Sequence, residues 1–410
     1  MTDSTTVSAR DLGSLYQYLE VLALTIILHK IIPVKPVKGY VCDWDGKPLL
    51  YRLNGLKVLV SAVAFYISLD ILNIRPLTTF SHNFPAIALS ATLIGLTAST
   101  LFYIFPTNPL VPDNPYRRTL TTDLLTSPRK TTLSKLRDAN ASTHPLWLRF
   151  YTGVEFNPRV QGIDVKMFLY LFGAVMLELV VLASVVAEKR RDGGVSGPML
   201  LCAGMYTWFC GEYMYHEDVH LYTYDIFAEK VGFKLLFGCL TFYPFFYPLP
   251  IYALSLHPTP TPLSPPLSLF LTALFITGWT LTRGANLQKH AFKINPKQPY
   301  YSVLFDTIRI PQRTLPGSTL LVSGFWGLSR HINYAGEIIQ AIAIALIVIS
   351  ATPAAGWWVW AAAVSYPAYY VALFVPRERE DGRVCEGKYG KVVWGEYVRR
   401  VRFRILPYCY

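Results

Sequence analysis

Long apolar runs separated by short polar connections dominate this chain. Runs with no charge, or with one, cover Ala86–Phe105, Met167–Ala187 and Leu235–Leu256. Each is close to the roughly 20 residues that a helix needs to cross the apolar core of a bilayer. The pattern therefore predicts helices that span a membrane.

A longer uncharged stretch, 338–376, corresponds to roughly 58 Å of helix. It predicts two crossings that reverse direction near Pro353 and Gly356. Weaker or shorter candidate spans are Leu15–Val34, Val58–Ile74, Met199–Tyr215, Leu267–Leu281 and Thr314–Ser329. We expect an all-α polytopic membrane protein of about ten transmembrane helices. It would form a single domain over 1–410, with the cofactor and catalytic half at about 200–410.

Composition agrees with a membrane protein. Hydrophobic residues make up 52% of the chain and charged residues only 16%, against about 25% in soluble domains. A net charge of +12 spread through such an apolar chain does not indicate nucleic acid. The longest polar connection, 107–164, is expected to be functional or disordered. It holds Asn140, whose tripeptide fits a glycosylation acceptor but is common by chance.

Polar residues near membrane depth are expensive and therefore point to function. The first cluster, Tyr213–Asp225, holds two histidines and three carboxylates within ten residues. Their spacing is not that of a zinc site, so no metal is predicted. The cluster is either a solvated interfacial turn or a buried polar pocket that hands over a proton.

Two further clusters and a basic tail follow. In Asn286–Lys293, Lys289 and Lys293 are four residues apart and share one helix face, either reaching lipid headgroups or binding phosphates. Gly324–Glu337 concentrates Arg, His, Asn, Tyr and Glu between apolar segments, which favours a functional site. The tail 376–410 would bind anionic lipids or the phosphates of a nucleotide. No glycine fingerprint follows a strand, so no Rossmann domain is expected.

Several sequence blocks resemble the membrane sterol reductases. This family includes the ergosterol-pathway carbon-14 and carbon-24 reductases, 7-dehydrocholesterol reductase and the lamin B receptor. The matching blocks, in the family's order, are Tyr51–Gly55, Phe156–Arg159, Asp164–Phe168, Glu217 with Asp225, Asn286–Lys289, Phe325–Glu337 and Cys385–Tyr410. Together they cover nearly the whole chain.

The resemblance implies an oxidoreductase of ergosterol, steroid or other lipid biosynthesis in the endoplasmic reticulum membrane. It implies NADPH as the cofactor, a sterol or steroid as the substrate and membrane lipids as surroundings, without fixing the oligomeric state. The cofactor residues would be Lys289, Lys293, Arg330, His331, Asn333, Tyr334, Arg377, Asp381 and Tyr389. The substrate residues would be Tyr215, Glu217, Thr223, Asp225 and Trp326.

An isolated carbon–carbon double bond accepts hydride only after it is protonated, so the site needs an acid. We expect Tyr215 or Tyr389 to donate the proton and Glu217 or Asp381 to relay it. The 14,15 ring double bond is the preferred target. The 24(28) or 7,8 double bond and a specialised steroid or triterpenoid are the alternatives, because the segment after Gly238 lacks the acidic residue of the carbon-14 branch. A membrane isoprenylcysteine-type methyltransferase and a non-catalytic receptor-like protein are further alternatives.

Overall fold

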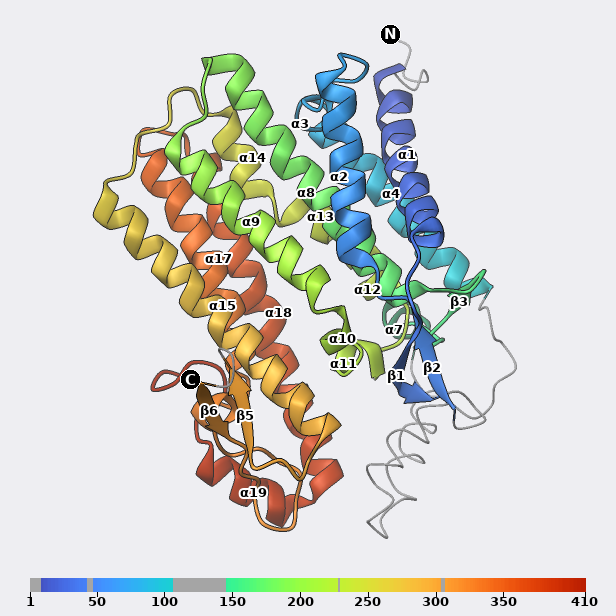
Figure 1. Cartoon of the computed structure of the whole chain (residues 1–410), viewed down its shortest axis with the longest axis vertical. Coiled ribbons are helices and arrows are strands. Elements are labelled where there is room, and N and C mark those ends of the chain that lie inside the picture. Colours follow the sequence, from blue (N-terminus) through green and yellow to red (C-terminus); the bar gives the residue numbers. More distant parts are fainter. Residues whose placement is uncertain (1–8, 43–46, 106–144, 228, 304–306) are drawn as a thin grey trace. The chain divides into compact units, whose positions relative to one another are not determined.

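A computed structural model describes residues 9–42, 47–105, 145–227, 229–303 and 307–410. Most of the polar connection 107–164, including Asn140, lies outside the described residues. The chain divides into two compact units, residues 1–259 and 260–410, which are described separately. Long helices dominate both units (Figure 1).

Unit 1 contains most of the secondary-structure elements. Its helices are α1 (Ala9–Ile31), α2 (Gly55–Ile71), α3 (Thr79–His82), α4 (Phe84–Ile104), α7 (Leu146–Thr152), α8 (Val165–Asp192), α9 (Gly197–Tyr215), α10 (Glu217–His220), α11 (Tyr224–Phe227), α12 (Phe233–Phe237), the π-helical η1 (Gly238–Phe242), α13 (Tyr243–Phe246) and α14 (Leu249–Leu256). Its strands are β1 (Val37–Cys42), β2 (Pro48–Tyr51), β3 (Arg159–Val160) and β4 (Ile163–Asp164), paired as two antiparallel hairpins.

Helix α8 forms the centre of unit 1. It packs against α2, α9, α13 and α14, and its side chains Phe172 and Met176 are fully buried. The helix begins at Asp164, whose carboxylate accepts a hydrogen bond from the Met167 N–H at 3.0 Å. This N-cap satisfies a backbone donor of the first turn. The helix ends at Gly193, whose left-handed φ of 75° suits glycine.

Unit 2 is a bundle of three long helices with a smaller cap. Its elements are α15 (Pro265–Ile294), β5 (Tyr300–Val303), β6 (Ile308–Pro311), α16 (Phe325–Leu328), α17 (Ile332–Ala351), α18 (Trp357–Tyr389) and α19 (Lys391–Arg400). Helix α17 packs against both α15 and α18 (Figure 1). The C-terminal residues return to α17, because the N–H groups of Arg330 and His331 donate to the carbonyls of Phe403 and Arg404.

Glycine allows α15 and α17 to approach closely. A Cβ on Gly336 would lie 2.4 Å from the Gly278 carbonyl oxygen and 2.3 Å from Thr282 Oγ1. Small residues at helix contacts are typical of membrane bundles, where close packing replaces the hydrophobic effect as the source of association. This contact fixes the depth at which the first turn of α17 sits against α15.

The prediction of a polytopic helical membrane protein is confirmed. Within the described residues, six helices are long and apolar enough to span a bilayer: 84–104, 165–192, 233–256, 265–294, 332–351 and 357–389. The reversal predicted near Pro353 and Gly356 is the turn between α17 and α18. The described sheets are two-stranded hairpins.

The expected count of about ten spans exceeds these six. Helices α1, α2 and α9 occupy predicted weaker spans, but α1 carries Glu20 and Lys30 and α2 has only 17 residues. The span predicted at Thr314–Ser329 is wrong. That segment holds an isolated bridge between Thr314 and Leu321 and the four-residue α16. Pro316 and two glycines with positive φ interrupt any longer helix there.

Candidate active site

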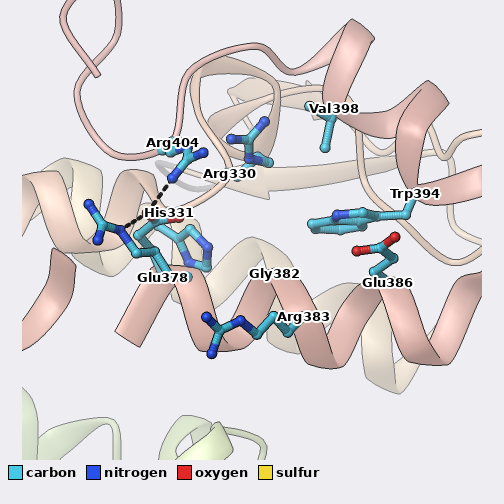
Figure 2. Close-up of a pocket in the computed structure, with 10 residues that line it drawn as sticks. Arg330, His331, Glu378, Gly382, Arg383, Glu386, Trp394, Val398 and Arg404 are labelled. Carbon is cyan, nitrogen blue, oxygen red and sulfur yellow. Dashed lines mark hydrogen bonds and ion pairs between the residues drawn. The ribbon is translucent and has the colours of Figure 1, made fainter. Parts of the chain in front are cut away.

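Unit 2 contains an open pocket with a volume of about 610 Å³ (Figure 2). It lies between the segment before α17, the polar half of α18, α19 and the C-terminal tail. Its lining residues are Arg330, His331, Glu378, Arg379, Gly382, Arg383, Glu386, Trp394, Val398 and Arg404. Four arginines against two glutamates leave the lining with a net charge of 4 − 2 = +2, which favours an anionic ligand.

A buried carboxylate organises one wall of this pocket. Glu378 is only 4% exposed, and its Oε1 accepts a hydrogen bond from Arg404 Nη1 at 2.9 Å (Figure 2). The same oxygen accepts a hydrogen bond from the Tyr410 hydroxyl at 3.0 Å. The pKa of the Arg404 guanidinium is raised, first by this hydrogen bond to Glu378. The tail is thereby fixed to α18 and closes this side of the pocket.

His331 lines the same pocket as a neutral imidazole. Its pKa is lowered to about 3, first by burial and then by the charges of Lys289, Arg330 and Arg377. Its Nδ1 lies 3.9 Å from Asp381 Oδ2, and its ring stacks on Tyr334 with centroids 4.9 Å apart. A neutral imidazole can donate one hydrogen bond and accept another without adding charge.

Tyr334 links the predicted cofactor residues of α17 and α18. Its hydroxyl donates to Asp381 Oδ2 at 3.0 Å. Its ring stacks on Phe374 with centroids 4.2 Å apart, and the Arg377 guanidinium lies 5.9 Å from the ring centroid. The structure therefore brings together His331, Tyr334, Arg377 and Asp381, which the sequence had suggested as one group.

Lys289 and Trp326 form a second contact in unit 2. The Lys289 ammonium lies 4.6 Å from the centroid of the Trp326 ring, within the range of a cation–π interaction. Trp326 Nε1 donates to the Ala285 carbonyl at 2.8 Å. Trp326 was predicted on the substrate side, but its contact here is with a predicted cofactor residue. Lys293 lies one turn further along α15.

Two cofactor candidates remain: Asn333, near the start of α17, and Tyr389, the last residue of α18. Asn333, in the first turn of α17, has a buried Oδ1 with no hydrogen-bond partner among the described residues. The Tyr389 hydroxyl lies 3.0 Å from Thr319 Oγ1. The amide oxygen of Asn333 can accept a hydrogen bond from a ligand, whereas the arginine-lined pocket, whose lining does not include Asn333, fits a ligand that brings negative charge.

The other predicted sterol-side residues lie in unit 1, around the end of α9. Glu217 is 5% exposed, and its Oε2 accepts a hydrogen bond from the Gly55 N–H at 2.7 Å. The Glu217 pKa is raised to about 7, because burial outweighs the hydrogen bond from the Gly55 N–H, which lowers it, and the nearby Asp218 charge adds to the rise. Tyr215 is 70% exposed. The Thr223 hydroxyl donates to the His220 carbonyl at 2.7 Å, and Asp225 lies in α11.

Sequence reasoning missed two residues that organise these groups. Glu378 reads as one charge among many in a basic tail, and only the fold shows that it is buried. Lys166 lies in a matching block, yet it was given no role. Its side chain is fully buried, and its ammonium donates to three backbone carbonyls of the segment after Thr223.

No group of three or more His, Cys, Asp or Glu side chains in the described part of the chain is arranged to hold a metal ion. The metal-free site stays a prediction.

Fold and pocket together define a polytopic helical membrane protein with an arginine-lined pocket in its C-terminal unit. The chain belongs to the ergosterol biosynthesis ERG4/ERG24 family, whose model matches residues 10–410. The predicted family resemblance is thus confirmed.

Relatives at full length support the same assignment. The chain is 32% identical over 405 residues to a Delta(14)-sterol reductase of Arabidopsis thaliana, which covers 97% of this chain and 96% of the relative. It is 32% identical to the Delta(14)-sterol reductase TM7SF2 of Mus musculus, covering 95% of this chain and 84% of the relative. The Delta(14)-sterol reductase erg24 of Schizosaccharomyces pombe is 28% identical, with 98% and 86% covered.

Proposed function

We propose that this chain is a membrane oxidoreductase that reduces the 14,15 double bond of a sterol with NADPH in the endoplasmic reticulum. The observation that carries the proposal is the full-length similarity to Delta(14)-sterol reductases of a plant, an animal and a fungus. The arginine-lined pocket of unit 2 supports a phosphate-bearing cofactor.

Binding of the cofactor is assigned to unit 2. Arg330, Arg379 and Arg383 supply guanidinium groups that hold phosphates by paired hydrogen bonds. Lys289 and Lys293 add positive charge from α15. The neutral His331 and the orphaned Asn333 amide oxygen recognise uncharged polar groups of the same ligand. When bound, NADPH supplies the hydride for the reduction.

Protonation of the double bond is assigned to the chain's own acids. The alkene gains a proton at one carbon and a hydride at the other, so both hydrogens of the product are accounted for. Glu217 is suited to hold the proton, because its raised pKa keeps a large fraction protonated near neutral pH. Tyr215, two residues earlier and accessible, is proposed to pass that proton to the sterol. Tyr389 and Asp381 of unit 2 are the second donor pair.

The experiment is reduction of a panel of sterols by the purified protein in lipid nanodiscs. We expect NADPH consumption with a 14,15-unsaturated sterol and a product heavier by two hydrogens in mass spectrometry. The matched substrates carry a 7,8 or a 24(28) double bond, and NADH replaces NADPH in a parallel set. Turnover of a 7,8 or 24(28) sterol alone would assign the chain to another branch. No turnover of any sterol would overturn the proposal.

A further inference from the structure

Three of the matching sequence blocks of unit 1 meet at the start of α8. Arg159 Nη1 donates to the Leu50 carbonyl at 2.7 Å, and the guanidinium lies 4.9 Å from the centroid of the Tyr51 ring. Arg159 Nη2 is also 3.7 Å from the carboxylate of Asp164, the N-cap of α8. Arg159 therefore connects the N-cap of α8 to two residues of β2, Leu50 and Tyr51.

Lys166 is in this first turn and is fully buried. Its Nζ donates to the carbonyls of Asp225 and Ile226, each at 2.9 Å, and to that of Glu229 at 2.5 Å. Three bonds use every donor of an ammonium group. A buried charge is very costly unless it is fully hydrogen-bonded, so Lys166 stabilises only a backbone that presents these three carbonyls together.

The other end of the same segment is held by Gly55, the first residue of α2. Its N–H binds Glu217 Oε2 at 2.7 Å. A Cβ at position 55 would lie 2.5 Å from Glu217 Oε1 and 3.0 Å from Met214 Sδ. A larger residue at position 55 would displace the ends of the Glu217 and Met214 side chains.

We propose that Lys166 and Gly55 are positioning residues that hold the segment 215–227 in the conformation that receives the sterol. The proposal rests on the proposed function, in which Tyr215, Glu217, Thr223 and Asp225 face the substrate. Lys166 fixes the turn that carries Asp225, and Gly55 fixes the carboxylate of Glu217. Neither touches the reacting atoms; both act through the residues they hold.

The first test needs no substrate. Hydrogen–deuterium exchange is compared between the wild type, Lys166→Met and Lys189→Met, a matched change at an exposed lysine near the other end of α8. We expect faster exchange in 215–227 for Lys166→Met alone, with α15, α17 and α18 unchanged. Unchanged exchange in 215–227, or an equal rise throughout the chain, would overturn the proposal.

The second test separates positioning from general damage. We expect Lys166→Met to lower kcat/KM for the sterol by about 100-fold, the loss typical of a small misplacement at a reacting centre. The Kd for NADPH should be unchanged, because its proposed residues lie in unit 2. Unaltered sterol kinetics, or an equal loss of cofactor binding, would contradict the positioning role.

Gly55→Ala serves as the second variant should Lys166→Met fail to fold. Its matched control is Gly204→Ala on α9, where an added Cβ meets nothing within 4 Å. We expect Gly55→Ala, but not the control, to speed exchange around Glu217 and to lower sterol turnover. If the wild type reduces no sterol, the proposed function fails, while the exchange experiment still decides whether Lys166 and Gly55 hold the segment.

Discussion

At the scale of single residues, two buried titratable groups behave in opposite ways. His331 has its pKa lowered to about 3, mainly by burial, so it is neutral at every pH at which the protein would be assayed. Glu217 has its pKa raised to about 7, also mainly by burial. We therefore expect Glu217, and not His331, to contribute to the pH dependence of the reaction near neutrality.

Glu217→Gln should remove the contribution of Glu217 to the pH dependence. In the wild type the protonated fraction of Glu217 falls as pH rises through about 7, and kcat/KM for the sterol should fall with it. The amide of Gln can still accept the Gly55 N–H bond but carries no transferable proton. We expect a rate loss of about 100-fold or more and, in pH-dependent kinetics, a weaker fall of kcat/KM with rising pH than in the wild type.

Glu188→Gln is the control for this change, because Glu188 is also buried in unit 1 and its Oε1 accepts a hydrogen bond from a backbone group, the Ser196 N–H, at 2.6 Å. It should keep the wild-type profile. A Glu217→Gln variant that retains both the rate and the pH step would remove Glu217 from the proton path.

The same pKa shift fixes the sign of a stability effect. The unfolded carboxyl ionises near its ordinary 4.5, whereas the folded one keeps its proton up to about 7. The folded state therefore binds more protons in this window, and the free energy of unfolding falls as pH rises from about 4.5 to 7, by about 3 kcal/mol at most.

At the scale of elements, the contact between α15 and α17 carries the geometry of unit 2. The two helices meet at Gly278 and Gly336, and Thr282 Oγ1 donates to the Asn333 carbonyl at 3.0 Å. Asn333 and Tyr334 lie in the turn that this contact supports. Displacing α17 would therefore move the pocket residues that precede and begin it.

Gly336→Ala should destabilise this packing. The new methyl would meet backbone atoms of α15 at 2.4 Å, which a rotamer change cannot relieve. We expect a loss of about 1–3 kcal/mol, as for other overpacked contacts, seen as a lower melting temperature in detergent. Gly395→Ala on α19 has open space around it and should be neutral or slightly stabilising. Equal effects of the two would contradict the close-contact argument.

At the scale of the whole molecule, the predicted sterol-side acids belong to unit 1 and the cofactor residues to unit 2. Substitutions of the unit 1 acids should therefore change the kinetics with the sterol, and substitutions of the unit 2 residues should change the binding of the cofactor. The unit 2 pocket carries a net positive charge, so cofactor affinity is also expected to fall with ionic strength.

Arg379→Gln and Arg383→Gln test this division. Both side chains are largely exposed, at 59% and 78%, so each should raise the KM for NADPH only about three- to tenfold, with the sterol KM unchanged. Arg400→Gln, an exposed arginine of α19 outside the pocket lining, is the matched control. A rise in both KM values would show that the arginines act on the fold rather than on the cofactor.

Much of the architecture could be predicted because a long apolar run is visible in neighbouring residues of the sequence. The runs at Met167–Ala187 and 338–376 became α8 and the α17–α18 pair, since a bilayer-length apolar run has few alternatives to a helix. Thr314–Ser329 failed because absence of charge does not make a helix where Pro316 and two glycines interrupt the backbone. The grouping of His331, Tyr334 and Asp381 was anticipated only through the family resemblance.

The sequence by itself determined that this is a polytopic helical protein, which family it belongs to and which polar blocks concentrate its chemistry. Only the tertiary structure decided that Glu378 and Lys166 are buried, that Arg404 closes the pocket and that Gly55 holds Glu217. The reason is physical: hydropathy is a property of neighbouring residues, whereas burial and hydrogen bonding depend on distant partners, as Gly55 and Glu217 show, which are 162 positions apart along the chain.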